Sequence, residues 1–382
     1  MTVPFIKLSL CSAAAFLVAA PALSQEVTFE VNPFTVFDWE ERLSAGVELA
    51  DVDGDGDLDA LIANGRHWAQ PDFVYYNTGD GRLTTARQIG DVLGPSYIVR
   101  AGDVDGDDDP DAVVVRDGVP AQVFLNDGTG VFSLAGDIEG SDGPARNALL
   151  EDLTGDGAPD LVTVQRRGGV FFFPGKGDGS FETPVPMPGD LNGATGISSA
   201  DFNKDGRTDL VIACRDGGPS YLLMNLAGRG WAEFPLEGSE GDHRQVVAAD
   251  LNRDGQADII LGSTKGTLSI LLGNGSRTFA AGQRFVEDGR SIQALAAADL
   301  DGDGDIDILE GAGEANNRVY LNDGFARFTT MPLDDASEDT YGVAIGDMNG
   351  DGLNDLVFAN SGAPNFVMIA ERETDAGTGA EE

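Results

Sequence analysis

The chain has 382 residues, of which 65 are acidic and 24 are basic, so its formal net charge at pH 7 is −41. Binding to nucleic acid requires clustered lysine and arginine against the phosphates, and attraction to anionic membranes requires the same, so this charge argues against both partner classes. Acidity at this level favours solubility, and its placement along the chain suggests a more specific role.

Residues 1–24 have the organisation of a secretory signal peptide. A single lysine, Lys7, precedes the apolar run from Leu8 to Ala20, and small residues suited to cleavage follow. No later segment has the roughly 18 to 20 apolar residues that a membrane helix needs, so we expect a mature protein without a transmembrane segment that is secreted or periplasmic. Cys11 is removed with the signal peptide, which leaves Cys214 alone, without a disulfide partner and expected in the core.

A nine-residue acidic motif recurs seven times along the rest of the chain. Its copies are spaced by 48 to 52 residues and begin at Asp51, Asp103, Asp152, Asp201, Asp250, Asp299 and Asp347. Each copy stands between two short apolar runs, and a third run, a tight glycine turn and a fourth run follow. Four strands and their connections fit this period, because strands typically have about five to six residues.

The apolar run after each motif predicts a strand that is covered on both faces, because it is almost unbroken and rich in Leu and β-branched residues. These runs are Leu58–Ala63, Ala112–Val115, Leu161–Val164, Leu210–Cys214, Ile259–Gly262, Ile306–Leu309 and Leu356–Ala359. The turn after the third run is often Asn-Gly or Asp-Gly, which supplies the positive φ of a tight hairpin. No stretch of helical period competes, so the chain is expected to be all-β.

Four-stranded units repeated around an axis form a β-propeller, and seven units form a closed ring of antiparallel blades. An open solenoid is the alternative, but the chain ends argue against it. The last repeat stops after its third run, Asn365–Ala370, whereas the alternating strand Glu26–Val31 belongs to no complete repeat. We predict that this N-terminal strand completes the seventh blade and closes the ring, which removes exposed strand edges. The propeller then spans residues 25–372, and residues 373–382 are expected to be a disordered acidic tail.

Side chains with oxygen atoms stand at positions 1, 3, 5 and 9 of every motif. Carboxylates held this close repel one another unless a cation neutralises them, and hard oxygen ligands in this number favour Ca²⁺ over Mg²⁺. Asx turns without an ion are the alternative, which seven copies in register make less favourable. We therefore predict up to seven Ca²⁺ sites, with the ligands Asp51, Asp53, Asp55, Asp59, Asp103, Asp105, Asp107, Asp111, Asp152, Thr154, Asp156, Asp160, Asp201, Asn203, Asp205, Asp209, Asp250, Asn252, Asp254, Asp258, Asp299, Asp301, Asp303, Asp307, Asp347, Asn349, Asp351 and Asp355.

The copies differ in charge and in one glycine. The third to fifth copies have Thr154, Asn203 or Asn252 at position 3, so we expect them to bind calcium more weakly. A glycine that permits the sharp turn stands at position 6 of six copies, whereas the second copy has Asp108 there.

The motif and its place between two strands resemble the FG-GAP or VCBS-type repeats of integrin α-chain-like propellers, whose hallmark is a DxDxDGxxD loop between the first and second strands of a blade. The resemblance covers Glu26 to about Arg372. It implies that positions 1, 3, 5 and 9 bind calcium through side chains and position 7 through its carbonyl, that the calcium is mainly structural, and that ligands bind on the opposite face. Members include adhesion receptors, lectins and some polysaccharide lyases, so the fold alone does not select a function.

The residue six positions before each motif is expected at the mouth of the central channel, because the first strand of a blade lines the axis. This gives a ring of Ala45, Tyr97, Arg146, Thr195, Arg244, Gln293 and Tyr341. Its Arg and Tyr side chains suit an anionic or sugar ligand, although ordinary polar rim residues are the alternative. The candidate ligand-binding residues are Tyr97, Arg146, Arg244 and Tyr341, with His243, His67 and Trp68 nearby.

These observations predict a secreted, calcium-binding propeller that acts, as a monomer, as a binding or adhesion module for a glycan or an extracellular protein. The alternative is a polysaccharide-active lyase, in which Tyr and His with Arg nearby abstract a proton next to a uronate carboxylate. No catalytic spacing is visible, so no catalytic residue is predicted and the enzyme is the less favoured hypothesis. A purely structural envelope component is a third.

Overall fold

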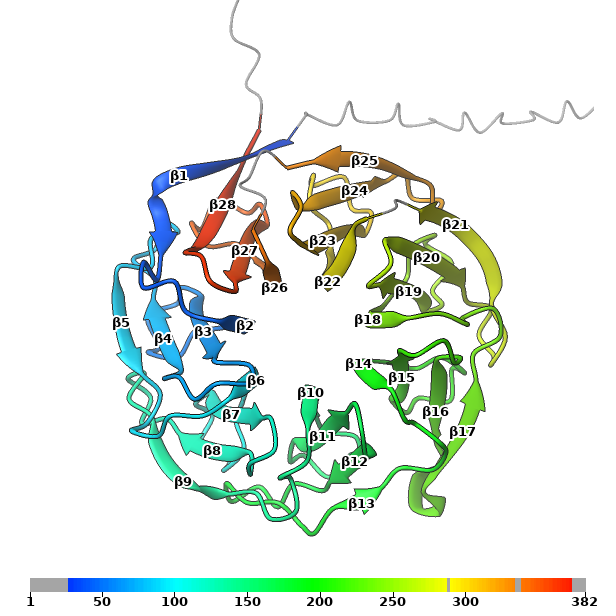
Figure 1. Ribbon diagram of the computed structural model, residues 1–382, viewed down its shortest axis with the longest axis horizontal. Coiled ribbons are helices and arrows are strands. Elements are labelled where there is room, and N and C mark those ends of the chain that lie inside the picture. The colour runs from blue at the N-terminus through cyan, green and yellow to red at the C-terminus, as the bar shows by residue number, and fades with distance from the viewer. Residues whose placement is uncertain (1–26, 287–288, 334–337, 373–382) are drawn as a thin grey trace, which may run out of the picture.

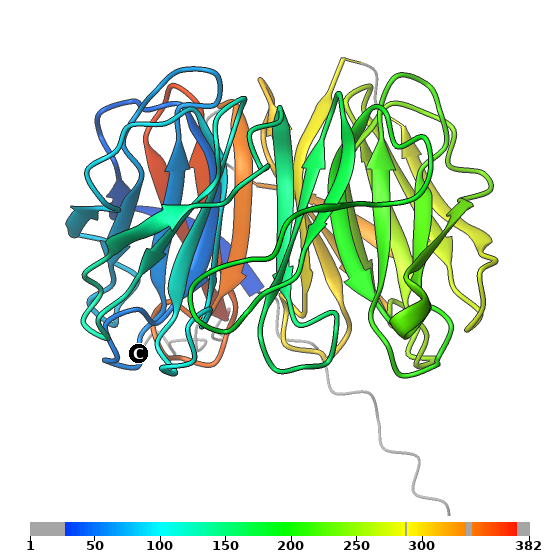
Figure 2. The same cartoon turned by 90° about the horizontal axis from the view of Figure 1, so that it is seen from below.

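The computed structural model describes residues 27–286, 289–333 and 338–372. The predicted signal peptide and acidic tail lie outside the described residues. The described residues form seven four-stranded antiparallel sheets arranged around a central axis (Figure 1), which confirms the predicted propeller. Seen from the side, the strands run between two faces that bear the connecting loops (Figure 2). No helix in the described ranges is long and apolar enough to cross a membrane.

In each blade the strands lie side by side from the axis to the rim, and in six of the seven blades they are consecutive in the chain. The innermost strands are β2 (Ser44–Ala50), β6 (Ser96–Gly102), β10 (Ala145–Glu151), β14 (Ala194–Ala200), β18 (His243–Ala249), β22 (Ser291–Ala298) and β26 (Thr340–Gly346). The second strands are β3 (Asp59–Asn64), β7 (Asp111–Arg116), β11 (Asp160–Gln165), β15 (Asp209–Cys214), β19 (Asp258–Ser263), β23 (Asp307–Gly313) and β27 (Asp355–Asn360).

The outer half of each blade is less regular than the inner half. The third strands are β4 (Phe73–Tyr76), β8 (Gln122–Leu125), β12 (Gly169–Phe173), β16 (Tyr221–Asn225), β20 (Thr267–Leu272), β24 (Arg318–Asn322) and β28 (Asn365–Arg372). The rim strands are β5 (Thr85–Gln88), β9 (Ser133–Asp137), β13 (Val185–Pro186), β17 (Trp231–Pro235), β21 (Ala280–Val286), β25 (Phe328–Pro332) and β1 (Val27–Phe37). A 3-10 turn, η1 (Ala227–Arg229), precedes β17.

The core lies between adjacent blades, and the second strands form most of it. All residues of these strands are buried. In β3, Leu61 and Ala63 pack with β7 of the next blade, whereas Ala60 and Ile62 pack with β27 of the preceding blade. Both faces of the strand are therefore covered, which explains the almost unbroken apolar run in the sequence. Cys214 lies in β15 with 1 % of its surface exposed, and burial raises the pKa of its thiol to about 12.

The N-terminal strand closes the ring. β1 pairs antiparallel with β28, and the order in this sheet is β1-β28-β27-β26 (Figure 1). The strand is longer than the predicted stretch, because it continues past a register shift between Val31 and Val36 and ends at Phe37. Phe37 packs against Tyr75 of β4, with 4.9 Å between the ring centroids. β1 therefore completes the seventh blade and also contacts the first.

The motif loops share one face with the hairpins that join the third and fourth strands, and we call it the motif face. Asn77, at the start of the first hairpin, donates to the carbonyl of Leu58 in its own blade (3.1 Å) and to that of Met348 in the seventh blade (2.8 Å). The same reach to the preceding blade recurs in three further hairpins, from Asn126 to Val52, from Asn225 to Leu153 and from Asn322 to Leu251. These amides link adjacent blades on the motif face.

Truncation of Phe37 tests the contribution of β1 to the closed ring. Phe37 is 3 % exposed, so Phe37→Ala should lower the free energy of unfolding by about 3 to 5 kcal/mol through lost burial and the cavity left behind. Phe34→Ala is the matched control in the same strand, because Phe34 is 67 % exposed, and it should cost less than about 1 kcal/mol. Denaturant titration measures both, and equal effects would contradict the packing role of Phe37.

Candidate metal and ligand sites

Each motif forms a tight loop that its own carboxylates organise. In the first loop, Asp51 accepts hydrogen bonds from the N–H groups of Gly54 (2.8 Å) and Gly56 (3.0 Å), and Asp53 accepts one from Asp55 (3.3 Å). Position 6 has a positive φ in every loop, including the second, where Asp108 has φ 72°. The sharp turn is therefore present in the second loop as well, although an aspartate replaces the glycine there.

The aspartate at position 9 is fully buried in every loop and joins the loop to its blade. Asp59 accepts from the N–H of Val52 (3.2 Å) with one oxygen and from the N–H of Asn77 (2.8 Å) with the other. Equivalent pairs of bonds reach Asp111, Asp160, Asp258, Asp307 and Asp355. Burial raises the pKa of these carboxyls, to about 6 for Asp59 and about 7 for Asp307. The position-9 carboxylate is thus a structural anchor whether or not a cation is bound.

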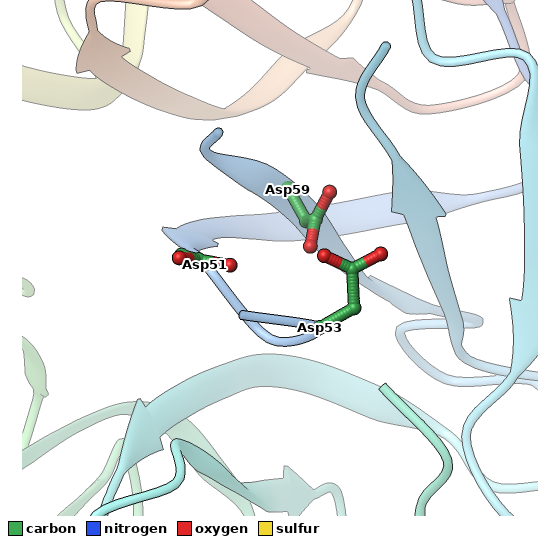
Figure 3. A group of neighbouring side chains, drawn as sticks. All are labelled: Asp51, Asp53 and Asp59. Atoms are coloured by element: carbon green, nitrogen blue, oxygen red, sulfur yellow. The ribbon is translucent and has the colours of Figure 1, made fainter. Parts of the chain in front are cut away.

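Three loops bring three acidic side chains together. Asp51, Asp53 and Asp59 each offer an oxygen atom within 4.8 Å of the others (Figure 3). The second and sixth loops do the same, with Asp103, Asp105 and Asp111, and with Asp299, Asp301 and Asp303. The remaining four loops have Thr or Asn at position 3 and therefore fewer carboxylates to gather, namely Thr154, Asn203, Asn252 and Asn349.

The electrostatics of position 3 favour a bound cation. Burial, followed by the charge of a neighbouring carboxylate, raises the pKa of Asp53, Asp105 and Asp301. In addition, Oδ1 of Asp105, Oδ1 of Asn203 and Oδ2 of Asp209 are buried without a hydrogen-bond partner in the described part of the chain. A divalent cation among these oxygens would satisfy the unpaired acceptors and relieve the repulsion, so the side chains fit the ion that the motif predicts.

On the opposite face, the residue six positions before each motif is the unpaired residue of a β-bulge. Ser44 pairs with Asn64 and Gly46 pairs with Ala63, which leaves Ala45 without a partner in β3. The same shift isolates Tyr97, Arg146, Thr195, Arg244, Gln293 and Tyr341 in the other innermost strands. A bulge re-aims the side chain that it isolates. We call these seven residues the bulge ring.

A cavity of about 330 Å³ lies on the axis, between the innermost strands. Five members of the bulge ring line it, which are Ala45, Tyr97, Arg146, Arg244 and Tyr341. Thr195 and Gln293 do not. The structure therefore gathers the four predicted ligand-binding residues of the ring around one space.

Asp117 joins three of the candidate residues in one network. His67 has Nδ1 2.7 Å from an Asp117 oxygen and Nε2 2.9 Å from the Tyr97 hydroxyl. Arg146 donates to the other Asp117 oxygen (2.7 Å), and its Cζ lies 4.4 Å from the Tyr97 ring centroid. Burial alone would raise the pKa of Asp117, but the hydrogen bonds from Arg146 and His67 lower it below its ordinary value.

Two arginines lie against Tyr341 and differ in their partners. Arg66 donates to the Tyr341 hydroxyl (2.7 Å), stacks 3.7 Å from the ring centroid and lies 3.9 Å from Asp339. Arg244 lies 4.9 Å from the same centroid and donates through Nε to the Gln293 carbonyl (3.2 Å). Among the described residues no carboxylate lies within 4.0 Å of the Arg244 guanidinium. Burial lowers the pKa of Arg244 to about 10.

The remaining predicted residues lie outside the cavity. His243 is 4 % exposed, and burial lowers the pKa of its imidazole. Trp68 is 69 % exposed on the connection between β3 and β4. Sequence reasoning missed Asp117 and the contact of Arg66 with Tyr341. The available signal was that both are polar residues in the connections that follow second strands.

A protein-family model described as an FG-GAP-like repeat matches the sequence in five overlapping segments, which are residues 51–114, 103–163, 152–212, 201–261 and 250–310. Each segment begins at one motif and continues into the second strand that follows the next motif. No curated protein sequence matches the chain.

Similar solved structures include a lectin and a complex of two proteins. The BP39L lectin from Burkholderia pseudomallei has a TM-score of 0.68 and 13 % identity, covering 85 % of this chain and 95 % of the lectin chain. BBS1N in complex with ARL6DN, soaked with mercury, has a TM-score of 0.60 and 12 % identity, covering 90 % and 97 % of the two chains. The same complex soaked with lead has a TM-score of 0.59 and 12 % identity, covering 91 % and 98 %. At these identities the likeness shows the fold alone.

The contrast between Arg146 and Arg244 predicts opposite effects on stability. Arg146→Gln removes one partner of a partly buried ion pair with Asp117, so it should lower the free energy of unfolding by about 1 to 3 kcal/mol. Arg244→Gln removes a half-buried charge that has no carboxylate partner, so the melting temperature should stay unchanged or rise. Thermal unfolding of the two variants is the measurement, and a clear loss of stability in Arg244→Gln would contradict the absence of a partner.

Proposed function

The chain belongs to the FG-GAP-like repeat family, and we propose that it is a secreted, calcium-stabilised binding module whose ligand is a glycan or an extracellular protein. The observation that supports binding most directly is the bulge ring, in which a repeated bulge isolates one residue per blade and five of these residues line a single cavity. Polar and aromatic side chains converging on a cavity are typical of ligand sites.

Calcium is proposed at the motif loops, with positions 1, 3, 5 and 9 as ligands. The support is the grouping of three acidic oxygens within 4.8 Å in the first, second and sixth loops, together with the unpaired ligand oxygens in the second and fourth. When bound, the ion supplies positive charge that offsets carboxylate repulsion and ties the loop to its blade. The first, second and sixth sites, which hold three acidic groups each, are expected to bind most tightly.

Export of the protein is proposed because residues 1–24 have the organisation of a signal peptide. An exported protein would meet enough free calcium to load such loops. The distribution of acidic residues agrees with a calcium-rich environment, because 28 of the 65 stand in the seven motifs that are proposed to bind calcium. Calcium at these loops would reduce the net negative charge where it is most concentrated.

A glycan and a protein are both compatible with the fold. Among similar solved structures one is a lectin and another is a complex with a protein, and both have the same overall shape as this chain. Tyr97 and Tyr341 offer aromatic faces and hydroxyl groups, whereas Arg146 and Arg244 offer charged donors, so the cavity suits a polar ligand with a ring or an extended side chain.

A polysaccharide lyase remains the second candidate, and one observation favours it. Asp117, His67 and Tyr97 form a hydrogen-bonded series that could position Tyr97 or His67 to accept a proton from a sugar ring. Arg146 beside this series could then pair with a uronate carboxylate. The binding module is favoured because Arg146 already pairs with Asp117, so its charge is partly committed.

Removal of calcium tests the proposed role of the motif loops. Treatment with EGTA should lower the melting temperature and increase sensitivity to proteases, because ions that bind only the folded state stabilise it by mass action. Readdition of Ca²⁺ should restore both, and elemental analysis of the dialysed protein should detect calcium. Unchanged melting in EGTA together with no bound metal would contradict the proposal.

The effect of Asp53→Asn on the melting temperature should differ between EGTA and saturating Ca²⁺. In EGTA, Asp53→Asn should raise the melting temperature or leave it unchanged, because it removes a crowded carboxylate whose pKa burial raises. In saturating Ca²⁺ the same substitution should lower it, because a ligand is lost. Asp57→Asn is the control at position 7, where only the backbone carbonyl is expected to bind, and it should leave the calcium-dependent increase intact.

Tyr97→Phe distinguishes the binding module from the lyase. At least one uronate-containing or neutral polysaccharide should bind wild-type protein on an array without giving unsaturated, ultraviolet-absorbing products, and Tyr97→Phe should weaken that binding only modestly. Product formation by the wild type that is lost in Tyr97→Phe at unchanged melting temperature would instead support the enzyme.

A further inference from the structure

We propose that the axial cavity binds a carboxylate group and that Arg244 is the residue that pairs with it. This inference rests on the proposed function, because it names the chemical class of the ligand at the bulge ring. It follows from the pairing of the charged groups around the cavity.

The cavity contains one cation without a counter-charge. Arg100 pairs with Glu48 at 2.6 Å, and both line the cavity. Arg146 pairs with Asp117 at 2.7 Å. Arg244 lines the same space, and no described carboxylate lies within 4.0 Å of it. Within the described residues, a chain with a net charge of −41 thus holds on its axis a positive charge that no carboxylate within 4.0 Å offsets.

A half-buried guanidinium without an anion is unfavourable, because it loses hydration that no partner replaces. Within the described chain its side chain makes a single hydrogen bond, from Nε to the Gln293 carbonyl, so its terminal nitrogens have donors to spare. The planar fork of a guanidinium matches the two oxygens of a carboxylate. A carboxylate is therefore the group that this arrangement of donors would pair with best.

A second donor lies beside Arg244. The Tyr341 hydroxyl accepts a hydrogen bond from Arg66, so its own proton remains available, and it donates to no other described residue. Tyr341 lines the cavity and its ring contacts Arg244. Asp339 lies 3.9 Å from Arg66 and beyond 4.0 Å from Arg244, so its partner is Arg66.

The size and charge of the site favour a monoanion that is part of a small polar molecule. The volume of about 330 Å³ lies at the lower end of the range for small-molecule sites. One unpaired cation matches one negative charge, and the acidic chain repels dianions more strongly at long range. The carboxylate could belong to a free small acid or to a uronate residue of a glycan.

Calorimetric titration of the calcium-loaded protein tests the class of ligand. The probes are D-galacturonate, its methyl ester, D-galactose, acetate and inorganic phosphate. We expect galacturonate to bind at least about tenfold more tightly than the ester and galactose, because only the acid pairs with Arg244. Acetate that binds as tightly as galacturonate would indicate a free acid, and weaker acetate binding would indicate a uronate; both outcomes support a carboxylate site.

Three variants assign the effect to Arg244. Arg244→Gln should reduce galacturonate affinity at least about tenfold without changing the weak binding of the ester. Arg87→Gln is the control, because Arg87 is exposed on β5 and its loss changes the net charge equally, and it should leave affinity unchanged. Asp339→Asn should also retain binding.

Several results would overturn the inference. These are equal binding of acid and ester, phosphate binding as tight as that of galacturonate, full binding by Arg244→Gln, or no binding by any probe. Binding of neutral glycans that Arg244→Gln leaves intact would contradict the carboxylate site and keep the proposed binding function. Absence of any glycan or protein ligand in the wider screen would contradict both.

Discussion

Seven buried aspartates, one at position 9 of each motif, organise the motif face. Six of them accept N–H groups from two chain segments, which in the first blade are Val52 in the loop and Asn77 in the hairpin, whereas Asp209 accepts one from Asn225. These carboxylates are buried in the protein, and burial raises the pKa of Asp59 to about 6. Because two chain segments depend on the same carboxylate, these hydrogen bonds set where the loop meets its blade, and a bound cation would add charge neutralisation at that point.

The innermost strand of each blade links the two proposed sites. β2 begins beside the bulge at Ala45 and ends at the motif that starts with Asp51, and the other innermost strands repeat this arrangement. Carboxylates collect at one end of these strands, whereas the arginines of the bulge ring lie at the other. A strongly acidic chain can therefore present arginines at its axial cavity, because the motif carboxylates lie at the other end of the strands, while Asp117 and Asp339 pair with Arg146 and Arg66 beside the cavity.

Much of this architecture was predictable from the repeat. The period, the acidic motif and the unbroken apolar runs are local in sequence, and they determined the number of blades, the buried second strands and the position of β1. The alternation of Glu26–Val31 predicted the start of β1 but not its continuation to Phe37, because the register shift after Val31 interrupts the pattern. Position 6 was predicted as a turn from its glycines, and Asp108 shows that the surrounding hydrogen bonds enforce the conformation.

Side-chain pairing around the axis could not be predicted in the same way. Asp117 and His67 come from different blades and are 50 residues apart, so nothing local in the sequence indicates that they meet. Counting from the motifs placed Arg146 and Arg244 in equivalent positions, yet only the first pairs with an aspartate, because Asp117 has no counterpart near Arg244. The repeat determines the backbone position of a residue within its blade. The neighbours that its side chain contacts depend on loops that differ between blades.

The pairing of β1 with β28 also determines how the ring resists mechanical force. Val27 lies opposite Arg372, so the free ends of the two strands emerge side by side at the same edge of the blade. Tension applied through these ends would load the hydrogen bonds one after another, as in a zipper, instead of all at once in shear. The propeller should therefore open at low force from this seam, while the six other blades, whose strands are consecutive in the chain, remain assembled.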